Sequence, residues 1–347
     1  MLKLGLETES LHLLFQHKRI NIFGFIEIAH ELGLDGVQIN IIKDYNLDEN
    51  WGTLGSNSDD HLKKVKDLLN KYGMYVELDM RNLDYEKVEE VLEVASKLGA
   101  EVVRSYIPIK PLKTQNVSSG SEGAYDFAKV RHDFDPNSYN EGIEKLNRIV
   151  PLLEKHRVKL ALENHEYETS EELVEVVKKV NSPWVGLIYD FGNSMMVWEE
   201  PEKAAENMAP YTFTTHFKDH IIIEEPNDKY GYVVCGVPAG EGNINLESCF
   251  DIMMKKSTLT RINIEMCYPY CAQFKRTPGT GGVEKVGEGA FKVEKHPYDY
   301  NIIKPLQYYY PHEVSDEMLK KMINDQIDGV EKTVAYLKNL RDRYFSK

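Results

Sequence analysis

Cysteine is scarce in this chain. Its 347 residues include four cysteines, at positions 235, 249, 267 and 271, and no two of them form a CxxC pair. Cys267 and Cys271 are too isolated from other thiols to suggest a zinc knuckle. We therefore expect reduced thiols in a reducing compartment and no disulfide framework.

Long apolar runs are also missing. No stretch approaches the roughly 20 residues that a membrane-spanning helix needs. The opening "MLKLGLETES" lacks the apolar segment of a signal peptide. These absences predict a soluble, cytoplasmic protein that has no membrane partner.

Positive charge is in deficit. The net charge is −14, and the acidic residues are spread along the chain instead of forming a tail. A nucleic-acid partner requires basic patches that contact phosphates, so the charge balance argues against one. The 42% hydrophobic content is nevertheless sufficient for a sizeable core.

The chain does contain a regular alternation of strand-like and helical segments. Strand-like apolar runs occupy 2–9, 36–41, 74–80, 101–107, 158–165, 185–190, 212–218 and 261–268. Helical periodicity occupies 20–34, 58–73, 84–100, 138–156, 170–180, 200–210, 245–256 and 315–342. Alternation implies parallel βαβ units, and eight of them imply a single (β/α)8 TIM barrel over residues 1–347. A doubly wound sheet would usually carry a glycine-rich loop after an early strand, which "LGLETES" lacks.

Polar side chains stand where several predicted strands end. They are Glu163 on the fifth strand, Asp190 on the sixth, His216 on the seventh and Glu265 on the eighth. In this barrel class the carboxyl ends of the strands form the active site. Three carboxylates in one mouth would repel one another without a cation, and oxygen ligands with one imidazole suit Mn²⁺, Mg²⁺, Co²⁺ or Fe²⁺. We therefore expect a divalent-metal site; each residue taken alone has a local structural role as its alternative.

The stretch "TFTTHFKDH" places further polar groups beside His216. Lys218 follows two residues later, so the strand period turns it the same way, toward a substrate oxygen. Asp219 either orients Lys218 or caps the next segment. Cys267 follows Glu265 by two residues and is expected one layer further out, not as a ligand.

Five motifs together resemble the xylose-isomerase-like superfamily of barrels. They are "LALENH", "IYDFGN", "THFKD", "GEGNIN" and "NIEMCY", in that order along the chain. The superfamily includes sugar-phosphate isomerases, ketose 3-epimerases and inosose dehydratases. The resemblance implies that Glu163, Asp190, His216 and Glu265 bind one divalent ion, most often Mn²⁺, with Mg²⁺ or Co²⁺ as alternatives. That ion would hold a substrate carbonyl and hydroxyl and stabilise the enediolate formed when a neighbouring C–H bond loses its proton.

The chain departs from its relatives at two places. Ketose 3-epimerases commonly carry a histidine three residues after the aspartate ligand, where this chain has Asn193. The apurinic-site endonucleases of the same fold need additional histidines that are missing here. Residues 269–313 form the second departure, an extended segment before the last helix; seven tyrosines occur from Tyr268 to Tyr310. We expect this segment to be either a structural cover or a flap that roofs the substrate or docks a partner.

A tyrosine-rich roof favours a substrate larger than a free sugar. The resemblance then points to the catalytic subunits of bacterial C-glycoside deglycosidases, which cleave the sugar–aglycone C–C bond of a 3-oxo-C-glycoside and work with a small β-rich partner subunit. A sugar isomerase or epimerase is the alternative, and a non-catalytic sugar- or metal-binding protein is a second alternative. We also expect an oligomer.

The enolising chemistry assigns roles to further residues. His165 follows Glu163 by two residues and is the expected base. The alternative is that His165 only holds Glu163 in position. Arg104 and Lys218 are expected to bind oxygens or stabilise the enolate, and Glu77 to bind substrate hydroxyls. Tyr268 and His312 are further substrate-binding candidates. In an epimerisation, Glu163 and Glu265 would act as the acid–base pair.

Overall fold

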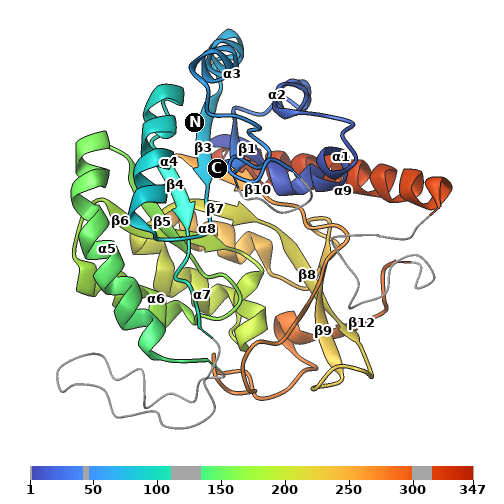
Figure 1. Cartoon of the computed structure of the whole chain (residues 1–347). Helices are drawn as coiled ribbons and strands as arrows, with labels where there is room; N and C mark the ends of the chain where they lie inside the picture. Colours follow the sequence, from blue (N-terminus) through green and yellow to red (C-terminus); the bar gives the residue numbers. More distant parts are fainter. Residues whose placement is uncertain (1, 42–46, 111–133, 299–314, 347) are drawn as a thin grey trace.

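The computed structural model describes residues 2–41, 47–110, 134–298 and 315–346. Eight parallel strands close into a barrel in the order β1-β10-β7-β6-β5-β4-β3-β2 (Figure 1). They are β1 (Lys3–Glu7), β2 (Gly36–Asn40), β3 (Tyr75–Asp79), β4 (Val102–Ser105), β5 (Lys159–Glu163), β6 (Val185–Asp190), β7 (Thr212–Phe217) and β10 (Arg261–Ile264). The predicted (β/α)8 barrel is confirmed, and each strand lies within its predicted range.

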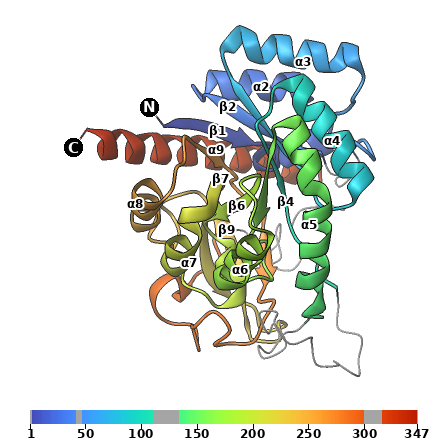
Figure 2. The ribbon, with the colours of Figure 1, turned by 90° about the vertical axis from the view of Figure 1, so that its left-hand side faces the viewer.

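Helices surround the barrel (Figure 2). They are α1 (His12–Gln16), α2 (Ile22–Glu31), α3 (Asp59–Tyr72), α4 (Tyr85–Leu98), α5 (Asn137–His156), α6 (Ser170–Val180), α7 (Pro201–Met208), α8 (Leu246–Lys256) and α9 (Asp316–Phe345). Short 3-10 turns supplement them, among them η1 (Thr8–Leu11) and η3 (Asn193–Val197). Among the described residues, no helix has both the length and the apolar character that crossing a bilayer requires.

Local sequence signals set the helix ends. Helix α6 begins with a capping box, in which the Thr169 hydroxyl accepts from the Glu172 amide and the Glu172 carboxylate accepts from the Thr169 amide. Helices α3 and α4 end at Gly73 and Gly99, both in the left-handed region that glycine adopts without a Cβ clash. These signals fix where each helix returns the chain to the barrel.

Glycines admit one aromatic side chain near the amino-terminal ends of the strands. The ring of Tyr75 lies against Gly5 and Gly36 of the two preceding strands, where a Cβ atom would come within 2.2 and 2.3 Å of Tyr75 atoms. The Tyr75 hydroxyl donates to Asn263 Oδ1 at 2.7 Å. This packing fills the barrel at the end opposite the strand termini that carry the predicted site.

The chain also forms a second, four-stranded sheet outside the barrel, which was not predicted from the sequence. It contains β8 (Asp219–Glu224), β9 (Tyr232–Val237), β11 (Cys271–Gln273) and β12 (Val293–Glu294) in the order β11-β9-β8-β12. Strand β7 ends at Phe217 and strand β8 begins at Asp219, so Lys218 is the single residue between the barrel strand and the first strand of this outer sheet.

All four cysteines are free and buried, in agreement with the expected reduced thiols.

Candidate functional site

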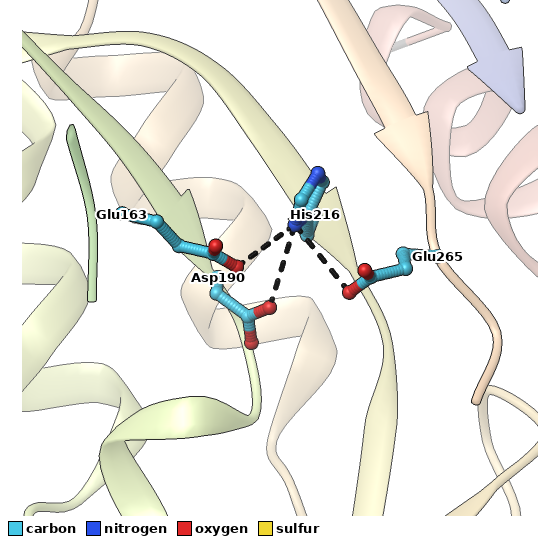
Figure 3. A group of neighbouring side chains, drawn as sticks. All are labelled: Glu163, Asp190, His216 and Glu265. Carbon is cyan, nitrogen blue, oxygen red and sulfur yellow. Dashed lines mark hydrogen bonds and ion pairs between the residues drawn. The ribbon is translucent and has the colours of Figure 1, made fainter. Parts of the chain in front are cut away.

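Four side chains converge at the carboxyl ends of neighbouring strands (Figure 3). Glu163 and Asp190 are the last residues of β5 and β6, His216 lies opposite Asp190 on β7, and Glu265 directly follows β10. Parallel strands place equivalent ends at one rim of the barrel. Each side chain offers a ligand atom, and these atoms lie within 4.8 Å of one another.

The imidazole of His216 lies between the three carboxylates. Its Nδ1 atom is 2.9 Å from Glu163 Oε1, 3.4 Å from Glu265 Oε2 and 3.7 Å from Asp190 Oδ2. Burial acts to lower the pKa of His216, but the charge of Glu265 and a hydrogen bond with Asp190 raise it above its usual value. Three carboxylates around one imidazole leave the cluster negative unless cations face it.

Two cations of the chain face this cluster. Lys218 Nζ lies 2.7 Å from Asp190 Oδ2 and pairs also with Glu265. Arg104 pairs through Nη2 with Glu163 and through Nη1 with Asp79 at 2.7 Å. Burial acts to lower the pKa of Lys218, yet the neighbouring carboxylates raise it well above its usual value. The lysine therefore carries its proton in the cluster.

The donor set fits a divalent ion. Asp190 Oδ2 and Glu265 Oε2 are buried, and the Lys218 ammonium is the ion-pair partner of both, although neither accepts a hydrogen bond of good geometry from the described residues. Both atoms face His216 Nδ1, at the centre of a set of three carboxylates and one imidazole. Hard oxygen donors with one imidazole suit Mn²⁺, Mg²⁺ or Zn²⁺. Glu163, Asp190, His216 and Glu265 would therefore hold such an ion.

Hydrogen bonds orient the opposite edge of the His216 ring, which carries Nε2. Its Nε2 lies 2.5 Å from Gln38 Oε1, while Gln38 Nε2 donates to Glu77 Oε2 at 3.1 Å. Because the Gln38 amide nitrogen is used by Glu77, its oxygen accepts from the ring, and His216 Nε2 carries the hydrogen. The Nδ1 lone pair is then directed toward the carboxylates, as a metal-binding histidine requires.

Glu77 was predicted to bind substrate and does not line the cavity. It is fully buried, and its carboxylate accepts from Thr214 and Asn263, both at 2.8 Å, as well as from Gln38. Strand β3 continues for two residues beyond it, to Asp79. Glu77 therefore lies one layer below the mouth, and Asp79 occupies the position at the rim.

Backbone amides and an asparagine hold two carboxylates of the cluster. The amides of Gly192 and Asn193 both donate to Asp190 Oδ1 at 2.8 Å. The Asn193 side chain donates to Glu163 Oε1 at 3.3 Å. Asn193, at the position where ketose 3-epimerases commonly carry a histidine, thus helps to orient Glu163.

A cavity opens beside the cluster. Its lining includes five residues predicted from the sequence, namely Arg104, Glu163, His165, Lys218 and Glu265. The His165 ring stacks on Tyr106, with centroids 4.5 Å apart. Burial lowers the pKa of His165 well below its usual value, and Arg104, Arg81 and Lys218 act in the same direction. His165 is therefore neutral, in the form that accepts a proton.

Two other positions singled out in the sequence lie away from the cavity, and a third is not described. The Tyr268 hydroxyl donates to Asp325 at 3.0 Å, so this side chain points to α9 and away from the cavity lining. Asp219 accepts from the amides of residues 220, 240, 242 and 244 and thus caps the segment after β9. His312 lies outside the described residues.

Sequence reasoning missed a further part of the lining. These residues are Glu9, Asn40, Asp79, Arg81, Glu166 and Tyr270. Asn40 and Asp79 are the last residues of β2 and β3, so the strand-end rule that located the acidic cluster applies to them too. Burial raises the pKa of Glu9 to about 8, against the opposing effect of Arg81. Glu166 and Tyr270 have no such sequence signal.

The chain is a closed eight-stranded barrel, and it carries a cluster of three carboxylates and one imidazole at the ends of its strands. These two features place it among the TIM barrels whose strand ends can hold a divalent ion. The chain belongs to the family described as "Xylose isomerase-like TIM barrel", whose model matches residues 26–280. The family resemblance seen in the sequence motifs is thus confirmed.

Individual relatives are distant. The chain is 27% identical over 243 residues to the uncharacterised protein YihM of Escherichia coli K12, a match that spans 70% of this chain and 65% of YihM. It is 20% identical over 274 residues to 3-oxo-isoapionate decarboxylase of Pectobacterium atrosepticum, across 79% and 89% of the two chains.

Solved structures share the fold. A D-tagatose 3-epimerase-like protein superposes with a TM-score of 0.55 at 19% identity, covering 76% of this chain and 91% of its own. A xylose isomerase-like barrel of Mycobacterium smegmatis in complex with magnesium gives 0.54 at 15% identity, covering 76% and 90%. At these identities the likeness establishes the architecture alone.

Proposed function

We propose that this protein is a divalent-metal-dependent enzyme that enolises a keto-sugar. The observation that carries the proposal is the convergence of four ligands, Glu163, Asp190, His216 and Glu265, beside a cavity that His165 and Lys218 also line. A site that only bound metal would not need a neutral base and a buried ammonium at the same cavity. Mn²⁺ is the proposed ion, with Mg²⁺ and Co²⁺ as alternatives.

The residues divide the chemistry among them. When bound, the ion supplies Lewis-acid stabilisation of negative charge on the substrate oxygens. His165, held neutral, takes the proton from the carbon next to the substrate ketone. Lys218 donates a hydrogen bond to the oxygen on which charge develops, and Arg104 pairs with Glu163 and holds it in place.

We favour a C–C lyase acting on a 3-oxo-C-glycoside. The proton leaves C2, the electron pair of that C–H bond forms the C1–C2 double bond, the C1–aglycone bond breaks, and the aglycone carbon takes up a proton. A relative named 3-oxo-isoapionate decarboxylase supports this choice, because decarboxylation also breaks a C–C bond. Such a lyase would work with a small β-rich partner subunit.

A sugar isomerase or epimerase is the second candidate. Its supporting observation is that Glu163 and Glu265 approach His216 Nδ1 from two different strands, β5 and the end of β10, at 2.9 and 3.4 Å. Two carboxylates on different sides of the site suit proton removal and return on opposite faces of a sugar carbon. Asn193 in place of histidine weighs against this candidate.

Metal analysis and two substrate classes test the proposal. Purified protein is expected to contain about one divalent ion per chain, and Glu265→Gln to lose both metal and activity. Aglycone release from a 3-oxo-C-glucoside supports the lyase, whereas interconversion of free ketoses supports the epimerase. Full activity after removal of metal with EDTA would refute the metal mechanism, and a metal-loaded protein inactive on both classes would leave a binding protein.

A pair of histidine variants tests the base. His165→Asn is expected to lower kcat at least about 100-fold while metal content stays unchanged. The matched control is His156→Asn at the end of α5, whose ring contacts Ser96 at the surface. Equal kcat values for the two variants would remove His165 from the mechanism.

A further inference from the structure

We propose that Glu166 and Tyr270 form a rigid wall of the cavity that selects a neutral, hydroxyl-bearing sugar unit. Both residues line the same cavity as the acidic cluster. Glu166 belongs to the loop after β5, and Tyr270 belongs to the segment between β10 and β11. This proposal rests on the proposed sugar chemistry and adds the class of sugar that the site accepts.

The backbone turns Glu166 toward the cavity. Along an extended chain, successive side chains alternate, and Glu163 and His165 line the cavity while Asn164 bonds instead to the backbone of Asp190. Simple alternation would direct Glu166 away as well. Its φ of 71° lies in the left-handed region, which a residue with a Cβ rarely adopts, and places Glu166 in the lining. Such a conformation persists at sites where function requires it.

Tyr270 is fixed at both ends. Its hydroxyl donates to Glu166 Oε1, and its carbonyl accepts from the Gly236 amide at 3.0 Å. Its ring is stacked over His220, with centroids 5.5 Å apart and an angle of 17° between the planes. The second oxygen of Glu166 faces Lys275 Nζ at 3.2 Å. The two side chains are therefore held together as one part of the cavity lining.

The chain that follows Tyr270 is anchored to the barrel. Phe274 stacks on Trp198 with centroids 4.0 Å apart. The Lys275 amide donates to the Met196 carbonyl, and Trp198 Nε1 donates to the Arg276 carbonyl, both at 2.9 Å. Contacts of this kind preorganise the wall, so ligand binding does not have to order it.

Charge decides which sugar the wall accepts. Arg104 is paired with Asp79 and Glu163, and Lys218 with Asp190 and Glu265. Arg81, the third cation of the lining, faces carboxylates too, because its charge opposes the rise that burial causes in the pKa of Glu9 and of Asp79. The Glu166 carboxylate, one oxygen of which faces Lys275, accepts hydrogen bonds from hydroxyls and adds to the carboxylates of the lining that oppose a phosphate or carboxylate.

The polar character of the lining agrees with this choice. The Tyr270 ring is buried, and the hydroxyl of Tyr270 and the carboxylate of Glu166 lie together in the lining, where they can reach sugar hydroxyls. A neutral monosaccharide unit is therefore expected to bind at this wall more tightly than a sugar phosphate or sugar acid.

Calorimetry on the Mn²⁺-loaded full chain tests the wall. The probes are D-fructose, D-psicose, D-tagatose, methyl 3-oxo-glucoside and D-fructose 6-phosphate. At least one neutral probe is expected to bind 10-fold or more tightly than the phosphate. Tyr270→Phe is expected to lower the affinity for the neutral probe about 5- to 10-fold. Glu166→Gln is expected to reduce the ratio of the affinity for the neutral probe to the affinity for D-fructose 6-phosphate. Both variants should keep their metal.

Two further variants keep the test decisive. Glu166→Gly removes the carboxylate at a backbone conformation that glycine adopts freely, so it gives a folded comparison. Tyr230→Phe is the matched control, because that hydroxyl has no hydrogen-bond partner among the described residues and does not line the cavity. Unchanged affinities in Tyr270→Phe and both Glu166 variants, preference for the phosphate, or no neutral probe bound would each overturn the wall.

Turnover separates this inference from the proposed function. If the neutral probe binds as expected but no substrate is converted, the enzyme proposal fails and the wall stands. If substrate is converted and the Tyr270 and Glu166 variants keep the kcat and KM of the unmodified protein, the wall fails and the enzyme proposal stands.

Discussion

His216 Nε2 lies 2.5 Å from Gln38 Oε1, and this contact fixes which ring nitrogen faces the carboxylates. Gln38 is itself oriented by Glu77, which two further side chains, Thr214 and Asn263, hold in the barrel interior. The chain Glu77–Gln38–His216 thus links a buried layer of the barrel to the ligand cluster at its mouth. Partners of this kind determine how well a histidine binds metal.

Gln38→Met is expected to weaken metal affinity about 10- to 100-fold, because the variant no longer holds the hydrogen on His216 Nε2. Competition with a metal-binding dye measures the affinity. Gln16→Met is the control, since Gln16 contacts His12 and not the cluster. Equal affinities in the two variants would show that Gln38 does not orient the ligand.

Lys218→Met is expected to move metal binding and turnover in opposite directions. The ammonium pairs with Asp190 and Glu265, so its removal frees two carboxylates for the ion and tightens metal binding several-fold. Turnover should fall about 100-fold or more, because the developing enolate loses a donor. Dye competition and steady-state kinetics provide the two readouts, with the exposed Lys63→Met as control. Normal turnover in Lys218→Met would contradict the assigned role.

Arg276→Met is expected to destabilise the fold by about 3–5 kcal/mol, the usual effect of removing one partner of a buried ion pair. Arg276 is fully buried and donates to both oxygens of Glu172, at 3.0 and 2.8 Å. The double variant Arg276→Met/Glu172→Gln should lose less than the single one, because it leaves no isolated charge. Urea unfolding measures both, and a larger loss in the double variant would exclude this explanation.

Glu199 gives the stability a defined pH dependence. Burial raises its pKa to about 7 in the folded chain, against an opposing effect of its bonds from Ser170. The folded state thus holds this proton more tightly than the unfolded state. This proton stabilises the folded state by at most about 3 kcal/mol. The stabilisation is fully present below the pKa that Glu199 has in the unfolded chain, and it is lost as the pH rises through about 7.

Glu199→Gln removes this contribution. The difference in unfolding free energy between the unmodified protein and the variant should therefore shift in favour of the variant from pH 5 to pH 8. Urea unfolding at several pH values measures the difference directly. A constant difference across this range would show that Glu199 does not change protonation on unfolding.

Much of the barrel follows from sequence periodicity, because each strand and helix is long enough to show its own pattern. The acidic cluster was predictable for a related reason: a parallel barrel brings all strand ends to one rim, so order along the chain becomes proximity in space. Glu163, Asp190, His216 and Glu265 needed no knowledge of loops.

Depth and loop path were not predictable in the same way. Glu77 and Asp79 both point into the barrel, and only the true end of β3 shows which one reaches the mouth. Tyr268 and Tyr270 are separated by one residue, Pro269, in an irregular segment, where no period assigns a direction. The two strands of the β8–β9 hairpin did carry short apolar runs, yet the completed count of eight strands left them without a predicted role.

The single-residue junction between β7 and β8 has a consequence for how relatives of this chain can diverge. The turn between β8 and β9, residues 225–231, belongs neither to the acidic cluster nor to the cavity lining, so a change of length there leaves the junction at Lys218 in place. An insertion or deletion of one residue next to Lys218 would instead shift the lysine relative to His216 and turn its side chain to the opposite side of the strand. Diversification is therefore expected in the hairpin tip, while the spacing from residue 216 to residue 219 stays constant.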